Sequence, residues 1–163
     1  GCPSPLLEDF SCVNGGRSSH PEDNVSFFQS SDGIVRRGLI DGNNSRTGVG
    51  VMFERSNNGL AEDIDVVRQG NGGLSGYPSS NLVFRRTRCR DTICTDQGRG
   101  LPASGSLCWT GSPESSNLRI QDSRYFNHCR SSLLWTSDVF TEEDYREEDF
   151  TPRAPLGLRF CWE

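Results

Sequence analysis

The sequence has no lysine, only three alanines and a single methionine among its 163 residues. Because alanine and lysine are strong helix formers, their scarcity argues against a helical protein. No apolar run approaches the roughly 20 residues that a membrane-spanning helix requires. The formal net charge of −5 leaves no overall basic field. This charge argues against nucleic acid as a partner.

Motifs for catalysis or metal binding are also missing. The sequence has no G-x-S-x-G, no H-E-x-x-H and no glycine loop of the kind that holds phosphate. Zinc is unsupported because there is no C-x2-C pair and the only histidines are His20 and His128. The oxygen-rich segment from Asp41 has Arg46 and Met52 where a calcium loop needs glycine and glutamate, so we expect an Asx turn there. We therefore predict no enzymatic activity, no metal and no cofactor.

Cysteine is abundant. Seven cysteines in a chain of this length indicate disulfides and an oxidising compartment. The predicted disulfide residues are Cys2, Cys12, Cys89, Cys94, Cys108, Cys129 and Cys161. The odd count leaves one cysteine free or bonded to another chain, and the sequence does not decide the connectivity.

Two N-glycosylation sequons begin at Asn24 and Asn43. Together with the cysteines they predict a secreted, extracellular glycoprotein. The hydrophobic fraction is only 33%. We therefore expect disulfides to supplement a sparse core, each contributing about 2–4 kcal/mol.

Short β-branched or aromatic segments alternate with Gly, Ser, Asn and Pro. The clearest are residues 34–40, 49–53, 64–68, 82–84, 107–109, 118–121, 133–135 and 156–162. Asn57-Asn58-Gly59 is typical of a hairpin turn. These features predict an all-β fold, a disulfide-stapled antiparallel β-sandwich or jelly roll with long loops. No internal repeat or second boundary is apparent, so residues 1–163 form one predicted domain.

At most one or two short helices are expected. Thr141-Glu142-Glu143-Asp144 resembles a helix capping box, with acidic residues in the first turn. A solvated loop is the alternative for this acidic segment.

The candidate binding residues are basic or aromatic. Arg86, Arg88 and Arg90 would project from one face of a strand and could bind an acidic polysaccharide or the carboxylates of the chain itself. Trp162 could add an exposed aromatic platform at the end of a terminal strand. The alternatives are a solvated charged face for the arginines and a core position for the tryptophan.

Two functions remain open from the sequence. The favoured one is a non-enzymatic structural or interaction module of a filament, matrix or surface assembly, which self-associates through sheet edges or termini. The alternative is a secreted carbohydrate-binding, lectin-like β-sandwich.

Overall fold

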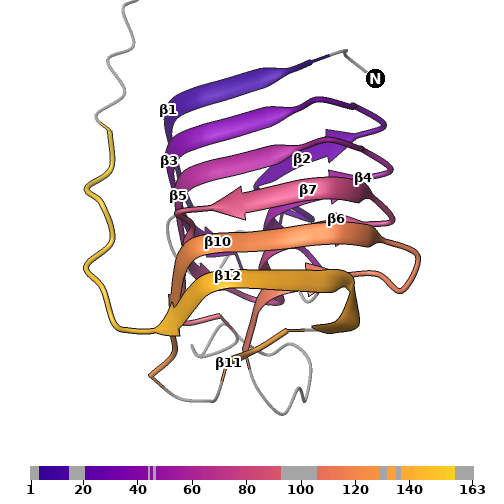
Figure 1. The fold of residues 1–163 in the computed structure, drawn as a ribbon. Helices are drawn as coiled ribbons and strands as arrows, with labels where there is room; N and C mark the ends of the chain where they lie inside the picture. The colour runs from indigo at the N-terminus through magenta and orange to yellow at the C-terminus, as the bar shows by residue number, and fades with distance from the viewer. Residues whose placement is uncertain are drawn as a thin grey trace, which may run out of the picture.

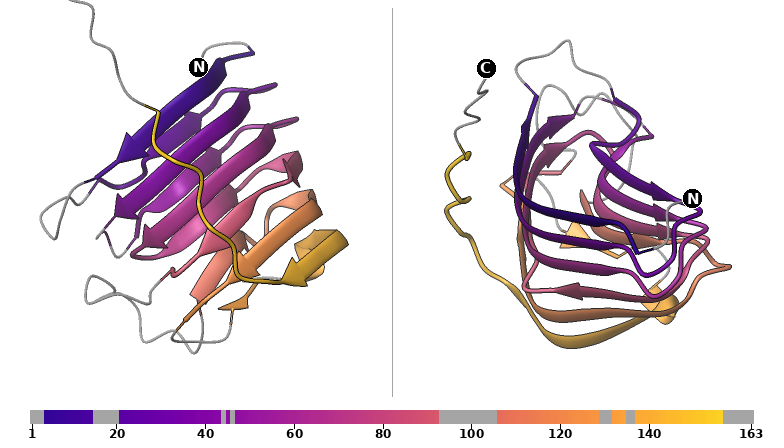
Figure 2. Two further views of the ribbon diagram at one scale, coloured as in Figure 1. Left: turned by 90° about the vertical axis from the view of Figure 1, so that its left-hand side faces the viewer. Right: turned by 90° about the horizontal axis from the view of Figure 1, so that it is seen from above.

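The computed structural model describes residues 4–14, 21–43, 45, 47–92, 106–128, 132–134 and 137–156. Over these residues the chain winds into stacked coils, a parallel β-solenoid with two facing sheets (Figures 1 and 2). Sheet A contains β1 (Leu6–Val13), β3 (Ile34–Asn43), β5 (Leu60–Gln69), β7 (Ser80–Arg85), β8 (Arg88–Arg90), β10 (Ser116–Phe126) and β12 (Phe140–Glu147). Sheet B contains β2 (Val25–Phe28), β4 (Val49–Glu54), β6 (Gly72–Tyr77), β9 (Ser106–Gly111) and β11 (Ser132–Leu133). A short 3₁₀ helix, η1 (Ser137–Val139), precedes β12.

Every strand pair in both sheets is parallel and in register from one coil to the next. In sheet A, for example, Ile34 lies opposite Leu60, and Leu60 lies opposite Val83. Equivalent residues of successive coils therefore form columns along the solenoid axis, about 4.8 Å apart. A side chain in the middle of the stack has its main neighbours in the coils above and below.

The all-β prediction is confirmed, but the antiparallel β-sandwich or jelly roll is wrong. Alternation of apolar and polar residues marks a half-buried strand equally well in parallel and antiparallel sheets. The turn at Asn57-Asn58-Gly59 carries the chain from β4 in sheet B to β5 in sheet A. It does not return the chain beside its own strand, as a hairpin would.

The predicted helix at Thr141–Asp144 is also wrong. These residues lie within β12, which pairs with β10 through partners such as Leu118 and Phe140. Pairing with the preceding coil outweighs the helix-capping signal, because each residue of β12 extends an existing sheet.

The disulfides are not found among the described cysteines: Cys12, Cys89 and Cys108 are free thiols. Cys89 and Cys108 are fully buried in the core cluster and hydrogen-bond to each other. They act there as small apolar side chains. The other predicted disulfide residues, Cys2, Cys94, Cys129 and Cys161, lie outside the described residues.

The core fills the space between the sheets and extends along the axis without interruption. Phe27 stacks on Phe53 with ring centroids 4.9 Å apart, and Phe53 meets Phe84 at 6.3 Å. Trp109 meets Tyr145 further along the stack, with ring centroids 5.4 Å apart. Stacked coils thus supply the apolar burial that the sequence analysis assigned partly to disulfides.

A column of buried serines fixes the turn between the sheets. Its members are Ser30, Ser56, Ser79 and Ser115. The backbone N–H of Ser30 donates to Ser56 Oγ at 3.0 Å, that of Ser56 to Ser79 Oγ at 3.0 Å, and that of Ser79 to Ser115 Oγ at 3.1 Å. The hydroxyls of Ser56, Ser79 and Ser115 therefore each accept the amide of the preceding coil where the chain leaves sheet B.

A second column at the same turn bears amide and carboxylate side chains. Asp32, Asn58, Asn81 and Asn117 all have positive φ values. Their side chains form a continuous chain of hydrogen bonds, with donor–acceptor distances from 2.7 to 3.2 Å. Asn and Asp tolerate the left-handed conformation better than other residues with a Cβ atom, which explains their repeated use here.

Sheet A bends at a third column, which also has positive φ: Asp9, Arg37, Asp63, Arg86, Asp122 and Asp144. The preceding column holds Glu8, Arg36, Glu62, Arg85, Gln121 and Glu143. We call these two columns the charge ladder, because acidic and basic pairs alternate over its first four coils. The view along the axis shows the bend (Figure 2).

The chain after β12 crosses the outside of sheet A from the last coil to the first (Figure 2). This strap, residues 148–156, is held by Arg90 Nη1, which donates to the Phe150 carbonyl at 2.7 Å. Further along, the backbone N–H of Arg153 donates to Asp65 Oδ2 at 2.7 Å and that of Leu156 donates to Ser11 Oγ at 2.6 Å. The strap therefore covers part of sheet A and leaves sheet B open.

The serine column makes a direct prediction. Ser79→Ala leaves the buried N–H of Ser56 without its acceptor and should lower the free energy of unfolding by about 1–3 kcal/mol. The matched control is Ser80→Ala, one residue away and partly exposed, which should change it by less than about 0.5 kcal/mol. Urea denaturation measures both, and equal effects of the two variants would contradict the structural role of the column.

The buried thiols make a second prediction. Burial and the neighbouring Cys108 raise the pKa of the Cys89 thiol, so little reactive thiolate forms in the folded chain. Iodoacetamide should therefore leave Cys89 and Cys108 unmodified in the native protein and alkylate both in urea. Mass spectrometry of the peptides gives the readout. Absence of labelling in urea without reductant would show that these thiols are oxidised.

Candidate functional site

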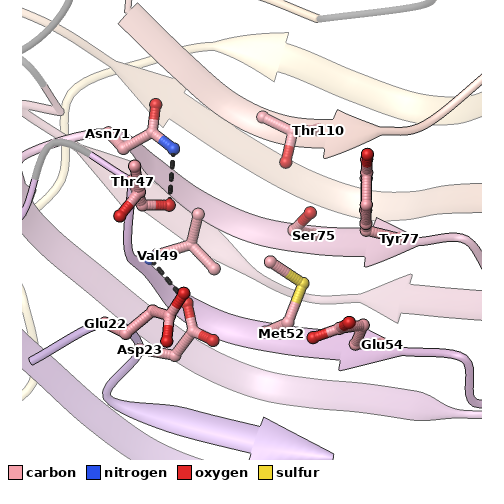
Figure 3. A pocket seen from close by; sticks show the side chains of 10 residues that line it. All are labelled: Glu22, Asp23, Thr47, Val49, Met52, Glu54, Asn71, Ser75, Tyr77 and Thr110. Carbon is pink, nitrogen blue, oxygen red and sulfur yellow. Dashed lines mark hydrogen bonds between the residues drawn. The ribbon is translucent and has the colours of Figure 1, made fainter. Parts of the chain in front are cut away.

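A groove of about 450 Å³ runs over the outer face of sheet B (Figure 3). Its lining residues are Glu22, Asp23, Thr47, Val49, Met52, Glu54, Asn71, Ser75, Tyr77 and Thr110. They come from β4, β6, β9 and the segments that precede β2, β4 and β6. The lining contains carboxylates, hydroxyls and an amide but no basic side chain.

The middle and one side of the groove are built from columns of the solenoid. Met52 lies opposite Ser75, and Ser75 lies opposite Thr110, so these side chains form one row along the axis. Glu54 pairs with Tyr77 on one side and with Phe28 on the other, which gives a parallel row. Adjacent coils lie about 4.8 Å apart, so the hydroxyls of Ser75 and Thr110 in the first row, and the polar ends of Glu54 and Tyr77 in the second, come from neighbouring coils at that spacing.

Two aromatic rings in the second row reach solvent. Tyr77 is 49% exposed and Phe28 is 48% exposed. The guanidinium of Arg55 lies 6.0 Å from the centroid of the Phe28 ring. Tyr77 and Phe28 flank Glu54 on neighbouring coils, so an acid lies between two exposed apolar faces.

Asp23 lies at the opposite side of the groove. Its Oδ1 accepts a hydrogen bond from the backbone N–H of Val49 at 3.0 Å, which ties the segment before β2 to the start of β4. Burial raises the pKa of the Asp23 carboxyl, and the nearby carboxylates of Glu22 and Glu54 raise it further. The groove therefore has a negative potential.

Asn71 completes this side. Its side chain is 8% exposed, and Nδ2 donates to the Thr47 carbonyl at 2.9 Å. Its Oδ1 has no hydrogen-bond partner among the described residues. The groove thus presents mainly acceptors and hydroxyls, and it favours ligands rich in O–H or N–H donors.

The arginines expected to bind a ligand are instead engaged within the protein. Arg86 pairs with Asp63 at 2.9 Å and lowers the pKa of that carboxyl. Arg88 makes two hydrogen bonds to the buried Asp65, and its guanidinium lies 4.8 Å from the Phe150 ring centroid. Arg90 holds the strap through the Phe150 carbonyl. The structure therefore brings all three arginines to sheet A, where carboxylates or the strap engage them.

The two sequon asparagines lie beside each other at the corner between the sheets. Asn43 is 1% exposed, and its Nδ2 donates to Asn24 Oδ1 at 3.1 Å. Asn43 Oδ1 accepts from the backbone N–H of Ser45 at 2.8 Å, so the expected Asx turn is present. Glycosylation at Asn24 and Asn43 stays a prediction, and Trp162 lies outside the described residues.

The sequence analysis missed the residues of the groove. Asp23 precedes a short strand, and Asn71 lies in a glycine-rich turn, so neither carries a local motif. A signal was available in the repeated Ser-x-[Asp/Asn] triplet at the turns, which begins at residues 30, 56, 79 and 115. Aligning the chain on these triplets would have put Glu54 beside Tyr77.

Comparison of the chain with protein-family models, curated proteins and solved structures finds no match. The functional argument therefore depends on the geometry of the chain itself. In the described part of the structure no helix has the length and apolar character needed to cross a membrane. The same part holds no cluster of three or more His, Cys, Asp or Glu side chains suited to a metal ion.

Asp23 gives a pH prediction with a matched control. A raised pKa means that its contribution to stability is complete below the ordinary value of 3.8 and is lost as pH rises through the folded-state value. Asp23→Asn keeps an acceptor for Val49 but cannot ionise, so wild type should lose stability relative to this variant as pH rises.

The control is Asp63→Asn. Arg86 lowers the pKa of Asp63, so its contribution is present above 3.8 and lost as pH falls through the lowered value. Relative to Asp63→Asn, wild type should therefore gain stability as pH rises. Urea denaturation at several pH values gives, for each pair, the free energy of unfolding of wild type minus that of the variant. If this difference changes in the same direction with pH for both pairs, the environments assigned to Asp23 and Asp63 are contradicted.

Proposed function

We propose that the protein is a non-enzymatic interaction module that binds an extended glycan chain in the groove of sheet B. The observation that carries the proposal is the pair of side-chain rows along the axis, with Glu54 between the exposed rings of Phe28 and Tyr77. Sugar rings stack on aromatic faces and donate hydroxyl hydrogens to carboxylates.

The periodicity supports a chain-like ligand. Polar groups recur at the coil spacing of about 4.8 Å, which is close to the advance per sugar along an extended pyranose chain. Successive sugars would then meet the hydroxyls of Ser75 and Thr110 on neighbouring coils, and Glu54 and Tyr77 in the parallel row. The negative potential of the groove favours neutral or amino sugars and disfavours the acidic polysaccharides expected from the arginine cluster.

Binding without chemistry is the simpler role for the carboxylates. Asp23 is already held as an acceptor for Val49 and so has a structural task. We also propose that the protein is secreted, and this is supported by the sequence motifs for glycosylation at Asn24 and Asn43. The cysteines support it less than expected, because the three described ones are free thiols.

Self-assembly into a filament, which the sequence analysis favoured, receives less support. Stacking one copy on another in register would place Glu143 and Asp144 of β12 against Glu8 and Asp9 of β1. Like charges at adjacent positions oppose such a contact. We therefore place glycan binding first.

The test is a screen of immobilised neutral, amino and acidic polysaccharides, followed by calorimetric titration. We expect Tyr77→Ala and Glu54→Gln each to weaken binding at least tenfold, which corresponds to about 1.4 kcal/mol. Tyr77→Phe keeps the ring and should retain most of the affinity. Asp138→Asn removes an exposed carboxylate outside the groove and should leave it unchanged.

Three results would overturn the proposal. One is the absence of binding to any polysaccharide, and another is binding that survives Tyr77→Ala and Glu54→Gln. The third is release of new reducing ends from a bound glycan, which would make the groove an active site.

A further inference from the structure

The charge ladder of sheet A matches acids with arginines over its first four coils. Asp9 pairs with Arg37 at 2.7 Å, and Glu8 pairs with the same guanidinium at 2.6 Å. Two coils further on, the pattern repeats with Glu62 and Asp63, which receive Arg85 and Arg86. An acidic pair on one strand is thus neutralised by an arginine pair at the same columns of the next coil.

The last acidic pair breaks this rule. Glu143 and Asp144 on β12 lie at the same columns, but the preceding coil offers Gln121 and Asp122. Glu143 accepts one hydrogen bond from Gln121 Nε2 at 2.7 Å. Asp144 is paired with Arg146 of its own strand, at 3.0 Å. No arginine pair from a neighbouring coil faces these two exposed carboxylates in the described structure.

Because β12 is an edge strand, Glu143 and Asp144 lie where a further strand could contact them. In the described part of the chain sheet A ends at β12, whose only strand partner there is β10 (Figure 1). The outer edge of β12 therefore offers backbone N–H and C=O groups to a further strand. The register of the ladder would align any such parallel strand with Glu143 and Asp144.

Two glutamates of β12 that lie in line with core residues of the preceding coil also limit which kind of strand can be added. Glu142 and Glu147 lie where the preceding coil has Ile120 and Tyr125. Both glutamates are exposed at the end of the core. A strongly apolar strand would have to pack against these carboxylates, whereas basic side chains would neutralise them.

We propose that the edge of β12 binds an extended segment of a different protein by parallel strand addition. The segment carries two adjacent basic residues that pair with Glu143 and Asp144. A second copy of this chain does not fit, because its own free edge strand, β1, brings Glu8 and Asp9 to those columns. Arginine fits better than lysine, because its planar guanidinium makes the two-pronged contacts seen inside the ladder.

The chain itself supplies the probe peptide. A synthetic peptide based on residues 34–41, Ile-Thr-Arg-Arg-Gly-Leu-Thr-Asp, copies the arginine pair of β3. Threonine replaces Val35 and Ile40, because these positions would face Glu142 and Glu147 in the register of the ladder. Its control has both arginines replaced by glutamate. Fluorescence anisotropy of each labelled peptide with the full-length protein should show at least tenfold tighter binding of the arginine peptide, with affinity falling as salt rises.

Charge reversal on the protein tests the location. The double variant Glu143→Arg with Asp144→Arg should lose at least tenfold in affinity for the arginine peptide and gain affinity for the glutamate peptide. The matched control, Glu114→Arg with Asp138→Arg, makes the same change in net charge outside both β12 and the groove and should keep the wild-type preference. Thermal melts of both double variants establish that they fold.

Equal binding of the two peptides to wild type would overturn the proposal. So would an equal loss in the two double variants, because attraction would then reflect net charge alone. Glycan binding in the groove is measured separately and stands or falls independently of this edge.

Discussion

The in-register stacking of coils is the constraint on which the whole structure depends. Once a strand pairs in parallel with the equivalent strand of the preceding coil, each residue is placed above a counterpart of known position. Uncharged hydrogen-bonding residues gain from this arrangement, because a serine or asparagine can donate to one neighbour and accept from the other. Charged residues are favoured when they alternate in sign, as they do over the first four coils of the charge ladder, since identical charges at about 4.8 Å repel. The serine column and the charge ladder are two responses to the same geometry.

Under this constraint the two sheets use their polar side chains differently. On sheet A the arginines are used to neutralise carboxylates and to hold the strap, as Arg88 does with Asp65 and Arg90 with Phe150. On sheet B the groove residues have few partners, and Glu54 and Tyr77 remain accessible. The arginine cluster that stands out in the sequence therefore has ion-pair partners within the chain, whereas the proposed binding groove is made of residues scattered along the chain.

Strands such as β3, β4 and β10 and several turn residues could be predicted from the sequence, whereas β1, β2, β6 and β12 and the arrangement of the strands could not. Val49, Val51 and Phe53 alternate with more polar neighbours, and the structure places them in β4. Asn58 was expected to have a positive φ, and it does. Both features are local and belong equally to a hairpin and to a solenoid turn. Only comparison of distant segments separates the two folds.

The repeat that would have made this comparison possible is masked by variable coil length. Successive serines of the buried column are separated by 26, 23 and 36 residues, so no fixed period exists. The extra residues fall in connections between strands, where a solenoid tolerates insertions without disturbing the columns. The groove is hidden in the sequence for the same reason, because Glu54 and Tyr77 become neighbours only when the chain is aligned on these serines.

A solenoid also has to end, because a bare terminal coil would invite another copy to add to it. At the first coil, the half-buried ring of Phe10 folds over Gly38 of the next, where any larger side chain would collide with it. At the last described coil, Phe140 and Tyr145 still pack with the core, but two inward columns finish in Glu142 and Glu147. The charge ladder finishes there in an acidic pair that would repel the acidic pair of β1 on another copy. The packing of Phe10 on Gly38 leaves the outer edge of β1 free, so in the described part of the chain it is the two acidic pairs that oppose stacking of copies. A strand of opposite charge would neutralise the carboxylates of β12, which is why the partner proposed for this edge is basic.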